Sequence, residues 1–371
     1  MKKIAKRAIP LLLVILMTAC LIIPANAEAF RLSQKATCIT QPPKTSFTEF
    51  YYTAGAQKVG IIPGIYKTNA YNPQGMTYWA AKDWLLIGLQ AIKSGDSAVV
   101  AIERSTGKFV GEWFWEGSTS HMGGIAATEY NLYITDSNAS VACVPLSTLE
   151  ALGSTGSFTA TTVLRLKTYM NTAPISYLGF DMESGIMVLG NYYYGGDSNY
   201  KKPARPECSS ILLGYDISGC TCSENEIAKL RSIALDPSFI VGFSSSIDRI
   251  QGAVYHDGQI IVSRSYGNFY SSFGLGGYIS EIDCFNIDLS SPLVSYTLTD
   301  IDGVCHDVPA FVTTKNPDQR MKDLPMSEGI VAVGDRLYIN YESGARTLLG
   351  GASQLCVYAT DYVWSVPIAK I

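Results

Sequence analysis

The segment His121-Met122-Gly123-Gly124-Ile125-Ala126, followed shortly by the run Leu132-Tyr133-Ile134-Thr135, is one copy of a pattern that recurs along the chain. In each copy a polar residue and a glycine precede a short apolar run, and a polar turn leads to a second apolar run. Short apolar and aromatic runs separated by Gly, Asn, Asp and Ser are typical of β-strands. The other copies begin with Gln74-Gly75-Met76, Gln251-Gly252-Ala253-Val254 and Glu328-Gly329-Ile330-Val331, and a weaker copy, with an apolar residue before the glycine, begins with Leu178-Gly179-Phe180-Asp181.

This repetition predicts an all-β protein and favours a β-propeller over a sandwich. The aligned glycines are Gly75, Gly124, Gly179, Gly252 and Gly329. A propeller blade usually takes about 40–50 residues, and the last two intervals are longer, so they hold insertions or a divergent blade. We expect five blades, with six as the alternative. Helical patterns are confined to Leu146 to Leu152 and Glu224 to Ile233.

Composition excludes several classes of protein. The 371 residues are 47% hydrophobic and 16% charged, which excludes a disordered chain. The formal net charge of −4 supplies no basic surface, so we expect no nucleic-acid partner.

The first residues predict export. Lys2, Lys3, Lys6 and Arg7 precede an apolar run from Ile9 to Ile23, and Ala25-Asn26-Ala27 matches a signal-peptidase site. We therefore expect a signal peptide over residues 1–27, a single propeller domain over 28–371, and a secreted or extracellular protein. Alternatively, Met17-Thr18-Ala19-Cys20 resembles a lipobox, which would make Cys20 a lipid anchor and the protein's contact with the membrane.

Eight cysteines remain after removal of such a signal, and an even number in an exported chain permits disulfides. Short loops favour pairing of Cys284 with Cys305, and of Cys208 with Cys220 or Cys222. A bond between Cys38 and Cys356 would join the two ends of the chain.

Propeller geometry predicts where a site would lie. The innermost strand of each blade begins at one face and the second strand returns to it, so residues at these two places should meet at one channel mouth. Before or beside the repeat glycines stand Gln74, His121, Gln251 and Glu328; after the second strands stand Gln90, Asp136, Asn191, Arg264 and Glu342.

Each of these side chains has a chemical and a structural interpretation. His121 could be a general base or a metal ligand, or simply a channel residue bonded to a carbonyl. Glu328 and Glu342 could form an acid–base pair, with Asp136 as a further catalytic candidate, or one carboxylate could pair with Arg264. Gln74 and Gln251 suit ligand orientation or bonds between blades.

Calcium is the candidate cofactor, because Glu328, Asp136 and Asn191 offer the oxygen ligands that it prefers. No secure metal site follows from the sequence. The segments Asn191 to Pro206 and Tyr266 to Tyr278 are rich in Tyr and Gly and suit flat contacts with sugars. Tyr266 is therefore a candidate ligand contact, although such tyrosines also occur in ordinary surface loops.

Several motifs together resemble an uncharacterised family of exported Gram-positive bacterial β-propellers. They are Pro73-Gln74-Gly75-Met76, His121-Met122-Gly123-Gly124-Ile125-Ala126, Gln251-Gly252-Ala253 with Ser263-Arg264-Ser265-Tyr266-Gly267, and Met326-Ser327-Glu328-Gly329-Ile330 with Tyr341-Glu342-Ser343-Gly344-Ala345. The resemblance implies a propeller and export, and no reaction. The chain is more loosely similar to calcium-dependent propeller lactonases and strictosidine-synthase-like proteins. Those proteins use a glutamate near the start of an inner strand, and Glu328 could match it.

Three functions remain open at this stage. The first is a secreted or surface-held propeller that binds a polysaccharide, another cell-envelope polymer or a small polar ligand at the channel mouth, through Gln74, His121, Asn191, Gln251, Arg264, Tyr266, Glu328 and Glu342. The second is a metal-assisted hydrolase or lactonase that uses His121, Asp136, Glu328 and Glu342. The third is a structural or protein-interaction module in which the polar ring only solvates the channel.

Overall fold

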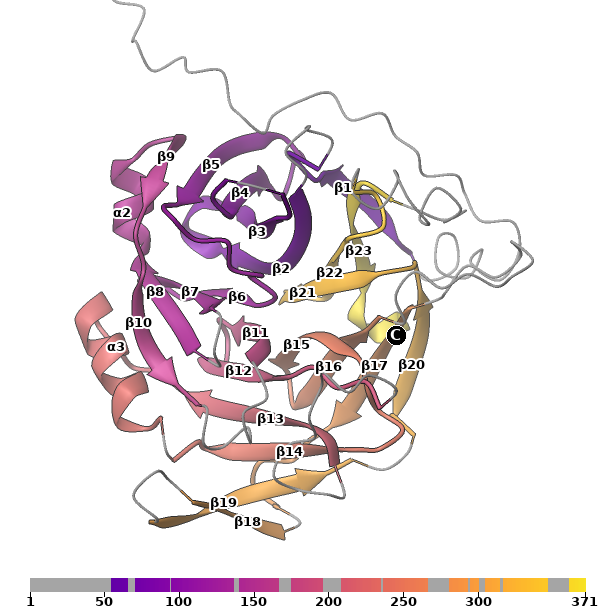
Figure 1. Cartoon of the computed structure of the whole chain (residues 1–371). Helices are drawn as coiled ribbons and strands as arrows, with labels where there is room; N and C mark the ends of the chain where they lie inside the picture. The colour runs from indigo at the N-terminus through magenta and orange to yellow at the C-terminus, as the bar shows by residue number, and fades with distance from the viewer. Residues whose placement is uncertain are drawn as a thin grey trace, which may run out of the picture.

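Five β-sheets surround a common axis and form a five-bladed β-propeller (Figure 1). The computed structural model describes residues 55–65, 71–93, 95–136, 140–166, 175–195, 208–234, 236–265, 280–292, 294–299, 304–313, 316–345 and 360–371. The predicted all-β class and the count of five blades are confirmed.

The blades follow one another along the chain, and each begins with its innermost strand. Blade 1 contains β2 (Tyr71–Trp79), β3 (Trp84–Ala91), β4 (Ala98–Glu103), β5 (Phe109–Trp115) and β9 (Thr155–Phe158). Blade 2 contains β6 (Ile125–Ala127), β7 (Asn131–Asp136), β8 (Ser140–Pro145) and β10 (Thr161–Arg165). Blade 3 contains β11 (Ile175–Asp181), β12 (Ile186–Asn191), β13 (Cys208–Asp216), β14 (Phe239–Ser244), β19 (Cys305–Val312) and β18 (Val294–Thr299). Blade 4 contains β15 (Ile250–His256), β16 (Gln259–Arg264), β17 (Ser280–Asn286) and β20 (Gln319–Asp323). Blade 5 contains β21 (Ser327–Val333), β22 (Arg336–Tyr341), β23 (Tyr362–Pro367) and β1 (Gln57–Ile61).

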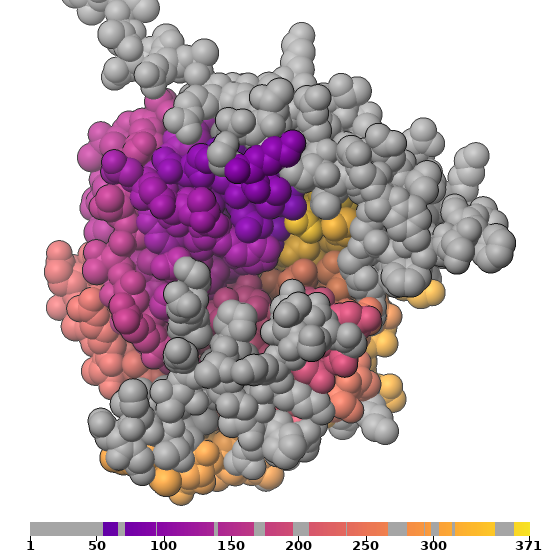
Figure 2. All heavy atoms as spheres, viewed as in Figure 1, coloured from indigo at the N-terminus to yellow at the C-terminus, as the bar shows by residue number. Residues whose placement is uncertain are grey.

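Blade 5 closes the ring by combining both ends of the described chain. Its outer strand β1 pairs antiparallel with β23, so that Gln57 lies opposite Ser365 and Ile61 opposite Tyr362. The yellow C-terminal strands consequently lie against indigo blade 1 (Figure 2). Pairing of the first described strand with the last closes the circle through backbone hydrogen bonds.

The repeat glycines lie on or beside the inner strands, where neighbouring blades approach too closely for a side chain. A Cβ on Gly124 would lie 2.1 Å from Leu178 N, and one on Gly179 would lie 2.0 Å from Ala253 O. Gly75, Gly252 and Gly329 show the same close approach to the next blade, and Gly329 of blade 5 meets Met76 of blade 1. The repeat read from the sequence is therefore the signature of a closed, narrow ring.

The axis is narrow enough that strands of non-adjacent blades meet across it. Strand β11 of blade 3 contacts both β2 of blade 1 and β21 of blade 5. Below the mouth, the described inner strands thus fill the centre of the ring.

Hydrophobic clusters occupy all five interfaces between blades. Blades 1 and 2, for example, pack Trp79, Leu86 and Trp113 against Ile125 and Leu132. The strands are apolar on both faces because each sheet is covered on both sides by its neighbours.

The long intervals between repeats are insertions at the outer edge. Helix α3 (Ser223–Ser232) connects β13 to β14, and the hairpin β18–β19 joins the edge of blade 3, with β19 parallel to β14. Helix α2 (Leu146–Ala151) leads to β9, which extends blade 1 by a parallel pairing with β5. Both helices confirm the predicted segments. Two short 3₁₀ helices, η2 (Ala80–Lys82) and η4 (Ile368–Lys370), complete the described elements.

The predicted disulfides within the described part of the chain are wrong. Cys143, Cys208, Cys220, Cys222, Cys284 and Cys305 form no disulfide with one another. Cys284 is fully buried in β17 whereas Cys305 is exposed on blade 3, because the insertion between them pairs with a different sheet. Cys20, Cys38, Cys356 and the predicted signal peptide lie outside the described residues. None of the helices described here has the length and apolar character needed to cross a membrane.

Candidate functional site

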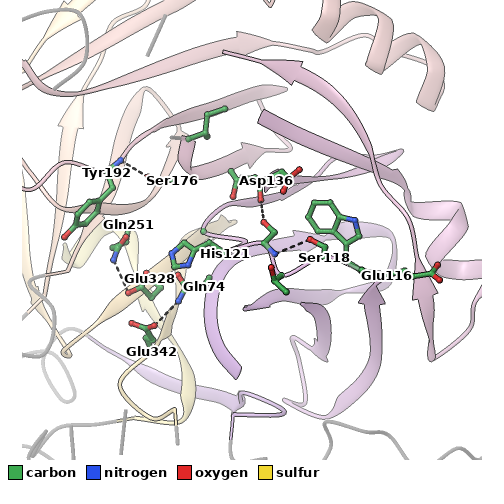
Figure 3. A pocket seen from close by; sticks show the side chains of 17 residues that line it. Gln74, Glu116, Ser118, His121, Asp136, Ser176, Tyr192, Gln251, Glu328 and Glu342 are labelled. Carbon is green, nitrogen blue, oxygen red and sulfur yellow. Dashed lines mark hydrogen bonds between the residues drawn. The ribbon is translucent and has the colours of Figure 1, made fainter. Parts of the chain in front are cut away.

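A cavity of about 820 Å³ lies at the axis, where the inner strands begin and the second strands end. It is lined by Gln74, Trp115, Glu116, Gly117, Ser118, Thr119, Ser120, His121, Gly123, Thr135, Asp136, Ile175, Ser176, Tyr192, Gln251, Glu328 and Glu342. Figure 3 shows side chains from different blades projecting into this shared space. The predicted channel mouth is therefore the place where the cavity forms.

Six of the predicted site residues line the cavity. All four side chains near the repeat glycines are present: Gln74, His121, Gln251 and Glu328. From the ends of the second strands come Asp136 and Glu342. Gln90 reaches the site indirectly, through a 2.8 Å contact with the His121 ring.

Glu328 and Glu342 form a pair of carboxyl groups whose charges are unfavourable in this position. Glu328 is 3% exposed, and burial, together with the neighbouring charge of Glu342, raises the pKa of Glu328 well above its usual value. Burial also raises the pKa of Glu342, to about 7, although hydrogen bonds from two amides oppose this shift. Both carboxyls therefore bind a proton more readily than a free glutamate does.

Amide groups hold both carboxyls in place. Glu342 Oε1 accepts hydrogen bonds from Asn72 Nδ2 at 2.6 Å and from Gln74 Nε2 at 3.0 Å. Glu328 Oε1 accepts a 3.3 Å bond from Gln251 Nε2. The opposite end of the Gln74 amide, its Oε1, is buried and makes no hydrogen bond with the described residues. Gln74 therefore has an acceptor left over at the cavity wall.

The His121 side chain is in contact with the solvent of the cavity, and it is also surrounded by many protein atoms. Its Nδ1 is 2.8 Å from Gln90 Oε1, and because an amide oxygen only accepts, Nδ1 carries the hydrogen. Burial by the surrounding protein lowers the pKa of His121, which favours the neutral ring with an unprotonated Nε2. The ring can thus accept a hydrogen bond or a proton from a ligand.

The backbone entering three of the inner strands is left-handed at residues other than glycine. Met122 (φ 54°) follows His121, Arg249 (φ 60°) precedes Gln251, and Met326 (φ 62°) precedes Glu328. Such conformations cost of order 1–3 kcal/mol and persist only where the surroundings impose them. The strained positions direct the next residues toward the mouth.

Several hydrogen bonds hold these entries. The Met122 carbonyl accepts a bond from Gly75 N at 3.0 Å, and the Met326 carbonyl accepts one from Glu342 N at 3.0 Å. Ser263 Oγ donates to the Glu328 carbonyl at 2.6 Å, and Asn340 Nδ2 donates to the Gln74 carbonyl at 2.8 Å. The site is thus built across blades 4, 5 and 1.

Arg264 lies outside the cavity and is 2% exposed. Its guanidinium donates to Glu281, Asp283 and Asp248 and to the carbonyls of Ser246 and Asp248. With every nitrogen engaged in protein contacts, this side chain supports blade 4 and does not face a ligand.

Asn191 and Tyr266 are likewise not part of the described cavity. The Asn191 amide is fully buried, donates to the Tyr192 carbonyl and accepts from Ile211 N. Tyr266 lies outside the described residues, as does most of each Tyr-rich segment.

The sequence analysis missed the loop before β6 and one residue of β2. Residues 116–120 and Trp115 form one wall of the cavity, but they precede the repeat motif and carry no pattern of their own. Asn72 could have been found, because it stands two positions before Gln74 and side chains alternate along a strand.

The described residues do not fit the calcium site considered from the sequence. Glu328 and Asp136 line the cavity, but the Asn191 amide is used by the backbone. In the part of the chain that the structure describes, no group of three His, Cys, Asp or Glu side chains is arranged to hold a metal. We derive no chemical step through a metal.

Comparison with known proteins assigns no family to this chain. No family model matches the chain, and no curated protein matches it. The resemblance to exported Gram-positive propellers therefore stays a prediction.

Solved structures with a similar fold include the GH43_1 enzyme from Xanthomonas citri complexed with xylose (TM-score 0.41, 11% identity, 81% of this chain and 88% of that one). A gluconolactonase from Xanthomonas campestris gives a TM-score of 0.34 at 11% identity, with 84% and 95% covered. Hydrazine synthase of Kuenenia stuttgartiensis gives 0.33 at 11% identity, with 74% of this chain and 57% of that chain covered. At this level of similarity, no substrate is carried over to this chain.

Proposed function

We propose that this protein binds a small, uncharged, hydroxyl-rich ligand of the carbohydrate class in the cavity at the channel mouth. The observation that carries the proposal is the convergence of Glu328, Glu342, Gln74, Gln251 and His121 on one cavity. The third hypothesis, that the polar ring only solvates the channel, does not account for two carboxyls kept in unfavourable positions.

Charge in the cavity favours a neutral ligand. No Lys or Arg stands among the described residues that line it, whereas four acidic residues do, so the side-chain charges there disfavour an anion. Burial and the neighbouring charge of Glu342 raise the pKa of Glu328 well above its usual value, which favours the protonated form of this carboxyl. A protonated carboxyl both donates and accepts hydrogen bonds, which suits a hydroxyl group.

Size and shape agree with this ligand class. A cavity of about 820 Å³ lies within the range of ligand pockets. Trp115 and Tyr192 add aromatic surface, while the free Oε1 of Gln74 and the Nε2 of His121 add acceptors. Alternating donors, acceptors and ring faces are what a sugar requires.

Binding can be tested by calorimetry and ligand-observed NMR with a panel of neutral monosaccharides and disaccharides, an amino sugar and a sugar acid. We expect a neutral sugar to bind, and Gln251→Ala to weaken it about tenfold or more through loss of a polar contact. Gln259→Ala is the matched control, since Gln259 lies at the far end of the same hairpin and bonds Asn286. Binding of only the acidic or amino sugar, or none, would refute the proposal.

Hydrolysis at the same site is the second candidate. The observation that favours it is the pair of buried carboxyls that line one cavity, because a protonated Glu328 could donate to a leaving oxygen while an ionised Glu342 takes a proton from water. Turnover of aryl glycosides and lactones would reveal it. Loss of turnover in both Glu328→Gln and Glu342→Gln, with binding retained, would assign these roles; intact recovery of every bound sugar would leave a binding protein.

We further propose, from the predicted signal peptide, that this activity lies outside the cell, where the ligand would come from polysaccharide or another envelope polymer. N-terminal sequencing of protein from the culture medium tests this proposal, and we expect the mature chain to begin after Ala27. Recovery only in the lipid-soluble fraction would favour the anchor at Cys20 instead.

A further inference from the structure

A fully buried carboxylic acid lies beside the candidate site without lining it. Asp323 ends β20 and is 0% exposed. Its Oδ1 accepts bonds from Tyr341 Oη and from Leu324 N, both at 2.7 Å. Its Oδ2 is buried and makes no hydrogen bond, and no ion pair of the described residues involves Asp323. Such a group is expensive to bury and calls for an explanation.

The residues around Asp323 are the sequence neighbours of the two cavity carboxyls. Tyr341 ends β22 and is followed by Glu342, while Ser327 begins β21 and is followed by Glu328. Ser327 and Tyr341 are opposite each other in the strand register. Because side chains alternate along a strand, these two point away from the cavity that Glu328 lines.

The connection from Asp323 to β21 is held at each end. Met326 in this connection adopts the left-handed conformation, and its carbonyl accepts the bond from Glu342 N. Ser327 N donates to Ser280 Oγ at 3.1 Å. Asp323 lies just before the strand that carries Glu328, and its hydrogen bond with Tyr341 connects it to the segment that carries Glu342.

We propose that Asp323 is a positioning residue for the cavity, which fixes Glu342, and with it the carboxyl pair, through its hydrogen bond with Tyr341. The inference rests on the proposed function, because burial of Asp323 is explained in this way only if the protein needs Glu328 and Glu342 in a fixed position. Asp323 itself touches no ligand in this account.

The titration of Asp323 agrees with this role. Burial raises its pKa to about 7, although the hydrogen bonds from Tyr341 and Leu324 and the nearby Ser327 hydroxyl oppose this shift. A protonated Oδ2 can then donate toward the Ser327 hydroxyl, which is also buried without a bond. The carboxyl of Asp323 can thereby hold the end of β22, at Tyr341, and the start of β21, at Ser327.

Tyr341→Phe tests the proposal in the full chain without any ligand. It removes only the hydroxyl that Asp323 accepts. Tyr133→Phe is the matched control, because Tyr133 is also fully buried and also donates to a buried carboxylate, Glu226 Oε1 at 2.8 Å, but lies away from the cavity. Both variants are expected to lower the unfolding temperature.

The readout is ¹³C NMR of the carboxyl carbons of the glutamates, with Glu342 assigned by Glu342→Gln. Wild-type Glu342 is expected to titrate at about pH 7. In Tyr341→Phe its midpoint should rise by roughly half to one unit, because displacement weakens the bonds from Asn72 and Gln74 that stabilise the ionised form. Tyr133→Phe should leave it unchanged. An unchanged midpoint in Tyr341→Phe, or equal changes in both variants, would overturn the proposal.

A second pair of variants guards against loss of folding. Asp323→Asn keeps an oxygen that can accept from Tyr341 and Leu324, so the Glu342 midpoint should stay near its wild-type value. Asp323→Leu removes that acceptor and should reproduce the change seen in Tyr341→Phe; the opposite order would refute positioning through this bond. If wild-type protein binds no sugar of the panel, the proposed function fails, while the NMR titration still decides whether Asp323 positions the pair.

Discussion

Replacement of Glu342 by glutamine is expected to stabilise the protein above neutral pH. The amide has the shape of the protonated acid, and its oxygen can accept the same two bonds from Asn72 and Gln74. What the substitution removes is the unfavourable ionisation of a carboxyl surrounded by protein and close to Glu328. A gain in stability on removal of a polar residue is typical of groups retained for function.

The magnitude follows from the pKa of Glu342. Burial raises it from the ordinary 4.5 to about 7, so between these values the folded protein holds a proton that the unfolded chain has released. The wild type therefore loses stability as the pH rises from 4.5 through 7, and the loss is complete above 7. At about 1.36 kcal/mol per unit, this loss is roughly 3 kcal/mol.

Urea unfolding of both proteins between pH 4.5 and 8 measures this effect. The free energy of unfolding of Glu342→Gln minus that of the wild type should rise by roughly 3 kcal/mol across this range. A rise below about 1 kcal/mol would refute the reasoning, since it would mean that the cavity does not hinder ionisation. As a control, Glu226→Gln should destabilise the protein at pH 7, because Thr128, Asn131 and Tyr133 all donate to that carboxylate outside the cavity.

Three further substitutions test other parts of the structure. Arg264→Ala should cost roughly 3–5 kcal/mol in urea unfolding, because it leaves buried Asp283 with fewer cationic partners; a loss of ligand affinity without loss of stability would contradict its structural role. Gly179→Ala should lower the free energy of unfolding by about 3 kcal/mol, because its Cβ would lie 2.0 Å from the Ala253 carbonyl oxygen. An unchanged free energy of unfolding in the same assay would show that the two blades can move apart to make room for the methyl group. The hydrogen bond with Asp181, opposed by burial, raises the pKa of His256. The stability that this pair contributes is therefore fully present below the ordinary pKa of 6.5 and is lost as the pH rises through the raised pKa. His256→Gln should therefore destabilise the protein more at pH 6 than at pH 9. The reverse order in thermal melts would show that His256 is neutral in the folded protein.

The repeat predicted the fold well because its glycines report a constraint that is the same in every blade. Gly75 through Gly329 are required wherever an inner strand meets the next one, so their spacing revealed the ring, and the long intervals revealed insertions. The polar residues beside these glycines line the cavity for the same reason. Strand geometry fixes where such residues lie along a blade.

Sequence position does not fix which partner a long side chain finds. Arg264 occupies the same place in its blade as residues that reach the mouth, but it is opposite Glu281 in the register and close to Asp283. These acidic partners come from a third strand, and no local pattern announces them. The cysteine pairings failed similarly, because the β18–β19 insertion carries Cys305 to another blade than Cys284. Asp323 escaped notice because its role depends on Tyr341, with which it shares no motif.

Because β11 meets β2 and β21 across the axis, we expect the cavity to open at the mouth alone. Whatever enters must leave by the same opening, so arrival and departure compete for one route. A ligand longer than the cavity keeps its remainder outside the mouth, and a polymer can present only a terminus or a side branch to the carboxyls at the bottom. Discrimination between chain ends and chain interiors is thus built into the closure of the ring.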